Sequence, residues 1–509
     1  MFAKTYGSTT EGVDGVLIDV EVDVSNGLPA FDIVGLPDTA VRESKERVRT
    51  AIRNSGLSMR AEKVTINLAP ADIRKDSSGL DLPIAMGLLL AHGLIPQGCT
   101  ENCLFAAELS LEGELRSIHG ILPMAVNGQA RGFTKIFVAE GNVNEALLVD
   151  GLQVYGMRNL SDLVDFLTGR KECQPEEKAA WDDEPVECGF DDFADVQGQF
   201  VAKRALEIAA AGGHNVLLVG VPGAGKTMLA RRMSSILPAM DRQEALEVTK
   251  IYSIAGLLKN NAGLITQRPF RSPHHTTSST AMIGGGSIPR PGEVTLSHRG
   301  VLFLDELPEF GKATLEVLRQ PLEDGVVTVS RVHASLTFPS RMILIASMNP
   351  CPCGWYGDDQ HACSCTANEI KRYTKKISGP LLDRIDIHIR VPRVDYKDLT
   401  STQMAESSLS IRKRVTAARD IQLARLQKYH IYCNAQMNHA MLQKTCPLTD
   451  MAQHLLEQVF KQKNLSARSY DRIIKVSRTV ADLDGSEHIE DRHVAEAIQL
   501  RNDIGLDAE

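Results

Sequence analysis

Residues 220–227 have the composition and spacing of a loop that wraps nucleotide phosphates. They read GVPGAGKT and fit the pattern G-x-x-x-x-G-K-[ST]. Glycines are needed because the backbone N–H groups must turn inward around the phosphates. In this interpretation Lys226 meets the β- and γ-phosphates and Thr227 ligates Mg²⁺. The run VLLV before the loop and TMLARRMSSIL after it predict a strand and a helix, which argues against a plain glycine-rich turn without a ligand.

Carboxylates that could complete this site follow a second apolar run. In VLFLDELPEF, residues 301–310, the apolar residues end at Asp305 and Glu306. We expect Asp305 to hold the Mg²⁺ shell and Glu306 to polarise the attacking water. A third run, MILIASMNP, places Asn349 at the tip of another predicted strand, where its amide could orient that water. The predicted contacts with nucleotide are Gly220, Val221, Pro222, Gly223, Ala224, Gly225, Lys226, Thr227 and Asp305.

Two arginines downstream are candidates for stabilising the transition state. Arg384 lies in LLDRIDIHIRV, and Arg468 opens the predicted helix ARSYDRIIKV. In ring ATPases a loop arginine acts on the γ-phosphate held by the neighbouring subunit and contributes roughly 10³–10⁵ in rate. The alternative for Arg384 is a salt bridge to Asp383 or Asp386. Arg468 could sense the γ-phosphate from a helical lid.

Four cysteines are clustered as C-x-C-x₉-C-x-C. They are Cys351, Cys353, Cys363 and Cys365. Thiolates in two close pairs suit tetrahedral Zn²⁺, so we predict a structural zinc site; free thiols are the alternative, and His361 could replace one thiolate. The cluster directly follows Asn349, which predicts a loop projecting from the core.

The basic insert from Arg268 to Arg299, between the glycine-rich motif and the acidic motif, is the candidate for nucleic-acid contact. Hydroxyls and glycines fill it, and Glu293 is its only acid. This mixture supplies phosphate donors without sequence readout. A second candidate is the predicted hairpin 326–338. The basic surface could instead be an ordinary loop, and Arg299 could serve the nucleotide site. The candidate DNA contacts are Arg268, Arg271, His274, His275, Arg290, Arg331 and His333.

The rest of the chain predicts the elements that position these residues. Apolar and acidic side chains alternate over residues 20–24, and a second strand-like run covers 31–34, with a turn at Asn26-Gly27 between them; this pattern predicts two strands. We expect a helix over 38–55 and a buried helix over 83–91 to follow. Residues 216–219, 301–304 and 342–346 predict central parallel strands. After residue 395 the pattern is helical, with helices over 405–427, 452–461, 467–480 and 492–501.

Composition limits the class of protein. The net charge is −8 and the pI about 6.0, so contact with nucleic acid must be local rather than over a basic surface. The N-terminus has no apolar run of signal-peptide length, and 83–91 is too short to cross a bilayer. We therefore expect a cytoplasmic protein without a membrane partner.

The motifs together resemble a known family. The runs DDFADVQGQFVAKRALEIAAAGGHNVLLVGVPGAGKT, RPFRSPHHTTSSTAMIGGG, VLFLDELPEF and NPCPCGWYGD are similar to the YifB/ComM family of magnesium-chelatase-related AAA+ ATPases, and the similarity extends to NLAPADIRKD and LSARSYDRIIKVSRTVADL. The resemblance implies a bacterial ring ATPase, a homohexamer, that uses ATP and Mg²⁺ and acts on single-stranded and branched DNA. It implies branch migration during natural transformation, with Arg384 as the finger acting in trans and Arg468 as the lid sensor.

The N-terminal segment resembles the Lon-type proteolytic domain, with its ribosomal-protein-like α/β fold. A Lon peptidase has a serine three residues after the aspartate of its active-site motif, whereas this chain reads Asp76-Ser77-Ser78-Gly79. Leu122 stands where the activating lysine would be. A hydroxyl without its base is a poor nucleophile, so we predict that the domain is not an active peptidase.

The expected fold class is therefore α/β: a phosphate-loop AAA+ core with a helical lid, preceded by a Lon-like α/β domain. The predicted divisions are a Lon-like domain over 1–170, an acidic linker over 171–192, a core over 193–394 with the cysteine loop at 351–365, and a lid over 395–509. The leading functional hypothesis is a DNA motor. The alternatives are a chelatase-like remodelling ATPase acting on protein partners, and an ATP-dependent peptidase.

Overall fold

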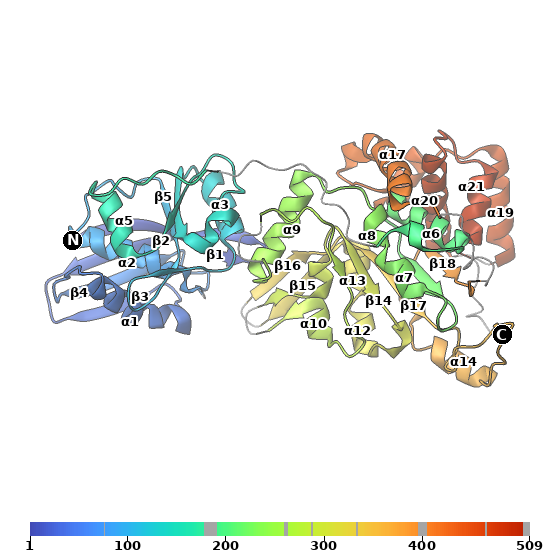
Figure 1. Cartoon of the computed structure of the whole chain (residues 1–509), viewed down its shortest axis with the longest axis horizontal. Coiled ribbons are helices and arrows are strands. Elements are labelled where there is room, and N and C mark those ends of the chain that lie inside the picture. Colours follow the sequence, from blue (N-terminus) through green and yellow to red (C-terminus); the bar gives the residue numbers. More distant parts are fainter. Residues whose placement is uncertain are drawn as a thin grey trace. The chain divides into compact units, whose positions relative to one another are not determined.

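The chain folds into two compact units in the computed structural model (Figure 1). The structure describes residues 1–75, 77–177, 191–258, 263–286, 289–331, 334–394, 405–463 and 466–501. Unit 1 comprises Met1–Glu184 and Arg242–Ile265, and unit 2 comprises Pro185–Asp241 and Thr266–Glu509. Asp76 and His333 lie outside the described residues. The domain boundaries given above stay predictions.

The described part of unit 1 contains a four-stranded sheet, a three-stranded sheet and the antiparallel pair β6/β7. The first has the order β1-β2-β4-β3, with the antiparallel pairs β1/β2 and β2/β4 and the parallel pair β3/β4. In β2, Val20, Val22 and Val24 are buried while Asp23 is exposed, so the alternation read from the sequence is confirmed. The second sheet is parallel, in the order β5-β8-β9. The strands are β1 Phe2–Glu11, β2 Asp14–Ser25, β3 Ala30–Val34, β4 Lys63–Ala69, β5 Cys103–Ala106, β6 Glu108–Leu109, β7 Leu115–Arg116, β8 Lys135–Ala139 and β9 Gln153–Met157.

Helix α2, Asp81–Ala91, is the expected buried helix, and every one of its residues is buried. Its one charged side chain, Asp81, accepts hydrogen bonds from Arg47 at 2.9 and 3.1 Å, which compensates the carboxylate for its loss of water. Arg47 belongs to α1, Thr39–Asn54, whose Val48 and Ile52 are buried against the same core. The other helices of the N-terminal segment are α3 Ile121–Ala130, α4 Val143–Ala146 and α5 Leu160–Leu167.

Unit 1 also includes a helix contributed from the middle of the chain. Helix α9, Arg242–Ile254, lies between elements of unit 2 in the sequence but packs on α3. The hydroxyl of its buried Ser253 donates a hydrogen bond to the buried carboxylate of Glu145, which also accepts from the Leu122 N–H at 2.8 Å. Arg242 donates to the Leu148 carbonyl at 3.3 Å. The chain therefore passes from unit 2 into unit 1 and returns.

Unit 2 contains a five-stranded, wholly parallel sheet in the order β11-β14-β17-β10-β18. The three strands expected at its centre are confirmed, and β10, β14 and β17 are buried along their whole length. β10 comes first in the chain and lies between β17 and β18, so the connections diverge at its carboxyl end, where α/β sheets bind ligands. The strands are β10 Val216–Val219, β11 Phe270–Arg271, β14 Val301–Leu304, β17 Ile343–Met348 and β18 Ile387–Arg390.

Short helices and two hairpins surround this sheet. The hairpins are β12 Gly284–Gly285 with β13 Arg290–Pro291, and β15 Val326–Arg331 with β16 Ala334–Pro339, which confirms the hairpin expected at 326–338. The helices are α6 Phe200–Gly212, α7 Lys226–Arg231, α8 Met233–Ile236, α10 Ser279–Ile283, α11 Glu293–Leu296, α12 Lys312–Glu316, α13 Arg319–Asp324, α14 Ala367–Thr374 and α15 Gly379–Leu382.

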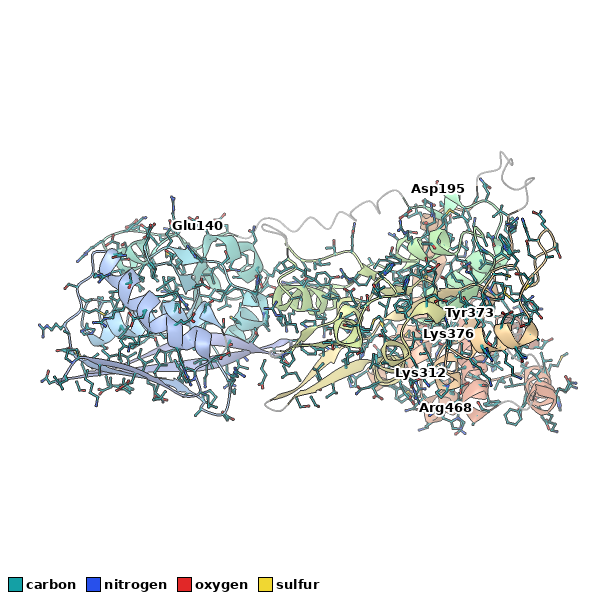
Figure 2. The ribbon with its side chains drawn as sticks, turned by 90° about the horizontal axis from the view of Figure 1, so that it is seen from below. Glu140, Asp195, Lys312, Tyr373, Lys376 and Arg468 are labelled. Atoms are coloured by element: carbon teal, nitrogen blue, oxygen red, sulfur yellow. The ribbon has the colours of Figure 1, made fainter. Side chains whose placement is uncertain are left out.

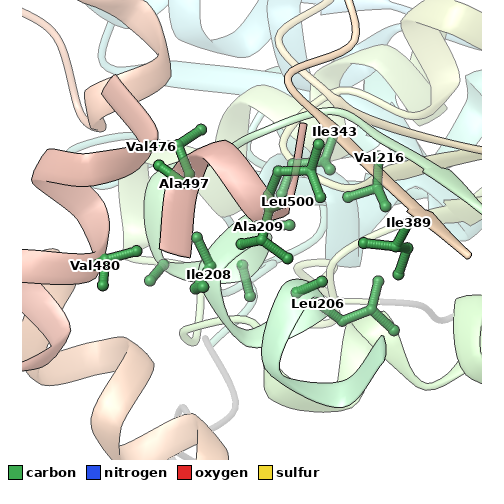
Figure 3. Packing of buried hydrophobic residues seen from close by; sticks show 14 of the residues in the cluster. Leu206, Ile208, Ala209, Val216, Ile343, Ile389, Val476, Val480, Ala497 and Leu500 are labelled. Carbon is green, nitrogen blue, oxygen red and sulfur yellow. The ribbon is translucent and has the colours of Figure 1, made fainter. Parts of the chain in front are cut away.

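A helical lid follows and shares one hydrophobic core with the sheet. Figure 3 shows Leu206 and Ile208 of α6 among side chains of the sheet on one side and of the lid helices on the other, including Val480. The expected helices after residue 395 are confirmed with small changes of bounds. They are α17 Ser408–Leu426, α19 Asp450–Lys463, α20 Ala467–Leu483 and α21 Asp491–Gln499, and α18 His439–Thr445 is a further helix that the sequence did not predict.

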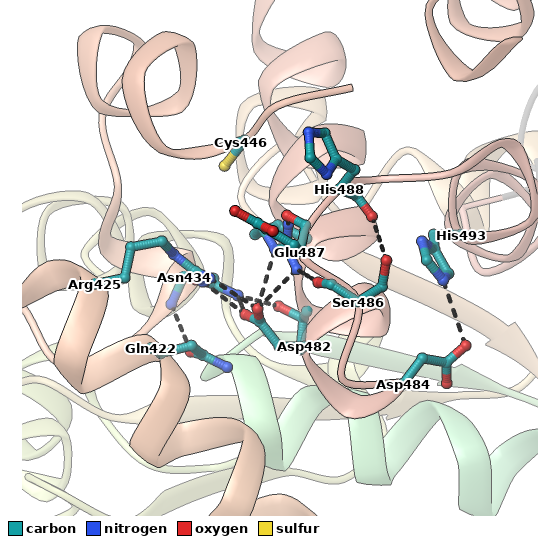
Figure 4. A network of polar contacts seen from close by, with 12 residues as sticks. Gln422, Arg425, Asn434, Cys446, Asp482, Asp484, Ser486, Glu487, His488 and His493 are labelled. Atoms are coloured by element: carbon teal, nitrogen blue, oxygen red, sulfur yellow. Dashed lines mark hydrogen bonds and ion pairs between the residues drawn. The ribbon is translucent and has the colours of Figure 1, made fainter. Parts of the chain in front are cut away.

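Buried polar contacts fix the lid. Within it, Asp482 accepts hydrogen bonds from Arg425 at 2.7 Å and from Asn434 at 2.8 Å (Figure 4). Between lid and sheet, the buried Asp386 pairs with Arg472 of α20 and with His214 at 3.3 Å. Burial alone raises the pKa of Asp386, but Arg472 and His214 outweigh it and the net direction is downward. Among the described residues, no helix is long and apolar enough to cross a membrane.

His388 in β18 gives the fold a measurable pH dependence. Burial lowers the pKa of His388 to about 4 from its ordinary value of 6.5. Between these values the unfolded chain binds a proton that the folded chain does not, so the free energy of unfolding falls as the pH drops from 6.5 towards 4, by about 3 kcal/mol at most. His388→Gln should remove this part of the dependence, measured by urea unfolding at several pH values. The exposed His454→Gln is the control, and equal pH slopes in wild type and His388→Gln would contradict the prediction.

Candidate active site

The phosphate loop connects the end of β10 to the start of α7. Gly223 and Gly225 have φ values of +79° and +88°, a left-handed conformation that a side chain disfavours. Gly220 is required for another reason, because a Cβ there would lie 2.4 Å from the Val391 carbonyl oxygen of the neighbouring segment. The glycines read from the sequence therefore serve backbone conformation at two positions and close approach at a third.

Lys226 and Asn349 meet at this loop. The ammonium of Lys226 donates hydrogen bonds to the carbonyl oxygens of Gly220 at 2.6 Å and Val221 at 3.1 Å, and to Asn349 Oδ1 at 3.1 Å. Burial lowers the pKa of Lys226, while Asp305 and Glu306 act in the opposite direction. A partly buried ammonium with oxygen acceptors around it, beside a loop of left-handed glycines, fits the phosphates of a nucleotide.

The residues expected to hold Mg²⁺ lie in contact. Thr227 Oγ1 donates to Asp305 Oδ2 at 2.8 Å, and the Glu306 N–H donates to Asp305 Oδ1 at 3.1 Å. Ser347 of β17 donates its hydroxyl to Asp305 Oδ1 as well. Hydroxyl and carboxylate oxygens of this kind fit Mg²⁺. Sequence reasoning missed Ser347, although a polar residue inside the apolar strand MILIASM was a usable signal.

Glu306 stands at the strand end in an unusual conformation. Its φ is +54°, which a non-glycine residue rarely adopts, and such strain is concentrated at functional sites. Its side chain is 59% exposed, and its Oε2 lies 3.7 Å from Nδ1 of His275. The His274 and His275 rings contact each other, with centroids 4.0 Å apart. His275, a candidate DNA contact in the sequence, thus lies beside the carboxylate expected to activate water.

The two candidate arginines converge on one carboxylate. Arg384, whose side chain is only 9% exposed, forms an ion pair with Glu323 of α13 and donates to the Pro380 carbonyl at 2.6 Å. Arg468 Nη2 lies 3.7 Å from the other oxygen of Glu323; Figure 2 labels Arg468 among the side chains. The expected salt bridge to Asp383 or Asp386 is therefore wrong in its partner: Arg384 pairs with Glu323, while Asp386 pairs with Arg472 and His214.

The basic insert divides into structural and exposed residues. Arg268 donates to the carbonyl oxygens of Pro238 at 2.6 Å and Arg299 at 2.7 Å, and Arg271 makes a bidentate pair with Glu293, both bonds 2.7 Å. His274 and Arg290 are exposed. The structure does not describe the side chain of Arg331, and His333 lies outside the described part of the chain. Contact with DNA stays a prediction for all seven.

Arg299, considered above for the nucleotide site, contacts the lid in the structure. Its guanidinium lies over the Tyr432 ring, 4.5 Å from the centroid, and its N–H donates to the Arg341 carbonyl at 2.7 Å. The residue is buried and has a φ of +60°. These contacts connect the sheet to the lid, so Arg299 has a structural role.

The four cysteines form a compact cluster. One ligand atom of each lies within 4.8 Å of all the others, and Sγ of Cys363 lies 3.7 Å from that of Cys351 and 3.6 Å from that of Cys353. Four thiolates on one tetrahedral ion with bonds of about 2.3 Å would be about 3.8 Å apart. His361 is not part of the cluster: it bonds to Asp358 at 2.9 Å and stacks on Trp355. The geometry could therefore hold a metal ion.

The cysteine cluster also touches the phosphate loop. A Cβ added to Gly354, in the turn between the two cysteine pairs, would lie 2.8 Å from the ring of Pro222. Gly354 has a φ of +88°, so a side chain there would be strained as well. The turn therefore packs directly on the loop expected to bind phosphates.

Gly79 and Leu122 stand where a Lon-type peptidase has its catalytic serine and lysine, and both are closely packed against their neighbours. Leu122 is buried, and a Cβ on Gly79 would come within 2.5 Å of Ile118 Cδ1. Ser78 donates its hydroxyl to Glu108, while Ser77 accepts from the Gly79 N–H at 3.1 Å. In the described part of unit 1 neither hydroxyl bonds to a lysine or a histidine; the buried Lys75 donates to the Pro70 carbonyl instead.

Comparison with known protein families agrees with this arrangement. Residues 192–399 match the family described as magnesium chelatase, subunit ChlI, and residues 405–501 match the C-terminal region of that subunit. Residues 20–142 match a further family described as subunit ChlI of Mg-chelatase. The fold and the site thus define a AAA+ ATPase of the magnesium-chelatase type, a class that uses ATP and Mg²⁺.

Relatives that match nearly the full length of the chain identify its family within this class of ATPases. The chain is 42% identical over 509 residues to the competence protein ComM of Haemophilus influenzae, covering 99% of this chain and 98% of that protein. It is 42% identical over 495 residues to the uncharacterized protein YifB of Escherichia coli, a match that covers 96% of this chain and 95% of that protein. The chain belongs to the YifB/ComM family of magnesium-chelatase-related AAA+ ATPases. The 38 kDa magnesium-chelatase subunit of Rhodobacter capsulatus is 25% identical over 176 residues, 31% of this chain and 50% of that subunit.

The geometry predicts separate effects on nucleotide binding and hydrolysis. Glu306→Gln keeps the loop and the contact between Thr227 and Asp305, so ATP binding should persist while turnover falls about 10²–10⁴-fold, the usual contribution of a general base. Equilibrium binding of a fluorescent ATP analogue and phosphate release measure the two. Glu309→Gln, three residues away and exposed, is the matched control. A loss of turnover as large in the control would remove Glu306 from this role.

Proposed function

We propose that this chain is an ATP-driven motor that assembles into a homohexameric ring in the cytoplasm and moves branched DNA. It would promote branch migration and unwinding during recombination of incoming DNA in natural transformation. The observation that carries the proposal is the 42% identity to a protein named for competence, over 99% of this chain. The contact of Thr227 with Asp305 and of Lys226 with Asn349 supports nucleotide hydrolysis as the source of movement.

Each residue of the candidate site would have a separate role in ATP hydrolysis. Bound Mg²⁺ neutralises charge on the phosphates. Thr227 and Asp305 would hold the ion, and Lys226 would hold the terminal phosphates. Glu306 would orient the attacking water and accept its proton, with Asn349 fixing the water's position. Arg384 would act on the nucleotide of the neighbouring subunit, and Arg468 would sense the γ-phosphate from the lid.

A remodelling ATPase that acts on protein partners is the alternative. The chelatase subunit of Rhodobacter capsulatus supports it through the shared motor fold, but the similarity covers only 31% of this chain. An active peptidase has less support, because Gly79 lies against Ile118 and Leu122 is a buried apolar residue.

One experiment separates these functions. The ATPase rate is measured with and without forked DNA, and unwinding of a four-way junction is followed in parallel. A DNA motor should show a rate raised by the fork and ATP-dependent loss of the junction. An unchanged rate together with an intact junction would contradict the DNA function and leave the remodelling ATPase.

Arg290 is the described residue that tests DNA contact most cleanly, because Arg271 is paired with Glu293 and Arg268 holds backbone carbonyls. Arg290→Ala should weaken DNA binding at all sequences and reduce the salt slope of binding by about 1, while the DNA-free ATPase rate is retained. Fluorescence anisotropy at several salt concentrations measures this. Lys461→Ala, an exposed cation on the lid, is the control. Loss of the DNA-free rate in Arg290→Ala would assign that loop to the nucleotide site instead.

We further propose that Cys351, Cys353, Cys363 and Cys365 hold one structural Zn²⁺. The sulfur separations support this, and the contact of Gly354 with Pro222 would transmit loss of the ion to the phosphate loop. The purified protein should contain about one zinc per chain. Cys363→Ser should lose the metal and raise the KM for ATP several-fold, while Cys173→Ser, outside the cluster, should keep both. Wild-type protein without bound zinc would contradict the assignment.

A further inference from the structure

Glu323 is the shared partner of the two arginines that the proposed function assigns to the γ-phosphate, Arg384 in trans and Arg468 from the lid. It lies next to the end of α13, and its two carboxylate oxygens face different elements. Oε2 pairs with Arg384, which follows α15, and Oε1 lies 3.7 Å from Arg468, in the first turn of α20. One carboxylate thus connects the core to the lid.

Arg384 cannot reach a neighbouring subunit while it is held in this way. Its side chain is 9% exposed, Nη1 donates to the Pro380 carbonyl, and Nε is buried without a hydrogen-bond partner. A buried donor without a partner is unfavourable, and in this position part of the guanidinium is left unsatisfied. An arginine that contacts a phosphate across an interface must leave this position.

The charges of Arg384, Arg468 and Glu323 favour replacement of the Glu323 carboxylate by another anion. Two guanidinium groups share the single charge of Glu323, whose side chain is 49% exposed. Guanidinium binds phosphate oxygens in the same forked geometry as carboxylate oxygens. The terminal phosphate of a nucleotide, with more charge, can therefore replace Glu323 as the ligand of both arginines.

The position of Glu323 also depends on a candidate DNA-binding element. Helix α13 ends at Asp324, and Gly325, with a φ of +67°, leads directly into β15 of the hairpin 326–339. The Ser340 N–H, just after β16, donates to the Gly325 carbonyl at 2.8 Å and closes the base of the hairpin. Movement of the hairpin base would consequently move Glu323.

We infer that Glu323 is a positioning residue that holds Arg384 and Arg468 away from the γ-phosphates they would contact, and that DNA on the β15–β16 hairpin releases them. This rests on the proposed function, in which Arg384 acts in trans and Arg468 senses the γ-phosphate from the lid. The carboxylate therefore keeps DNA-free turnover low, and the release couples DNA contact to hydrolysis.

The test is Glu323→Gln, which keeps the size of the side chain and removes its charge. In the full-length protein the DNA-free kcat should rise several-fold, and the stimulation by forked DNA should shrink by the same factor, while DNA affinity is unchanged. Glu323→Ala should behave alike and serves if the first variant folds poorly, as judged by circular dichroism and gel filtration. Asp324→Asn, the adjacent exposed acid, is the matched control and should resemble wild type.

Arg384→Ala separates failure of this inference from failure of the proposed function. It should lose about 10³-fold or more in rate, and adding Glu323→Gln should restore none of it. If Arg384→Ala hydrolyses ATP normally, the trans role itself is wrong. If Arg384→Ala is inactive but Glu323→Gln has the DNA-free rate and DNA stimulation of wild type, or a lower rate, the holding role of Glu323 is overturned and the trans role stands.

Discussion

The contact between Thr227 and Asp305 is the constraint on which the ATPase core of unit 2 depends. It joins the helix after β10 to the end of β14, two strands that are not neighbours in the sheet. β17 must therefore lie between them, and it contributes Ser347 to the same carboxylate. Parallel strands bring their carboxyl ends to one edge, so a short polar cluster there requires the whole buried sheet behind it. The glycines of the loop and the αL conformation of Glu306 are local adjustments to that edge.

A second set of polar contacts extends from this edge to the lid. Asp386, two residues after Arg384, is buried with Arg472 and His214, and α20 carries both Arg472 and Arg468. Because a buried charge is costly without its partner, the register of α20 against the sheet is fixed. That register places Arg468 near Glu323 and so beside Arg384. The position of Arg468 beside Arg384 is thus a consequence of lid packing.

Much of this could be predicted from the sequence because the signals are local. The phosphate loop, the apolar strands ending in Asp305 and Asn349, the buried helix at 83–91 and the lid helices each depend on residues a few positions apart. The YifB/ComM resemblance rested on such motifs and is confirmed by the full-length relatives. Helix α9 was not anticipated as part of unit 1, since nothing in its pattern distinguishes packing on α3 from packing on the sheet. The catalytic, zinc and DNA-binding roles of the named residues stay predictions.

The sequence by itself determined which segments become strands, turns and helices, and which residue types could bind phosphate or metal. Only the tertiary structure decided which distant groups meet. Glu323 and Arg384 are 61 positions apart, and Glu145 and Ser253 are 108 apart. The structure also places His275 beside Glu306. It pairs Arg271 with Glu293, so this guanidinium is already engaged by a carboxylate. Backbone preference and hydrophobic period act over a few residues, whereas partners of charged groups are chosen by the packing of whole elements, which no local pattern encodes.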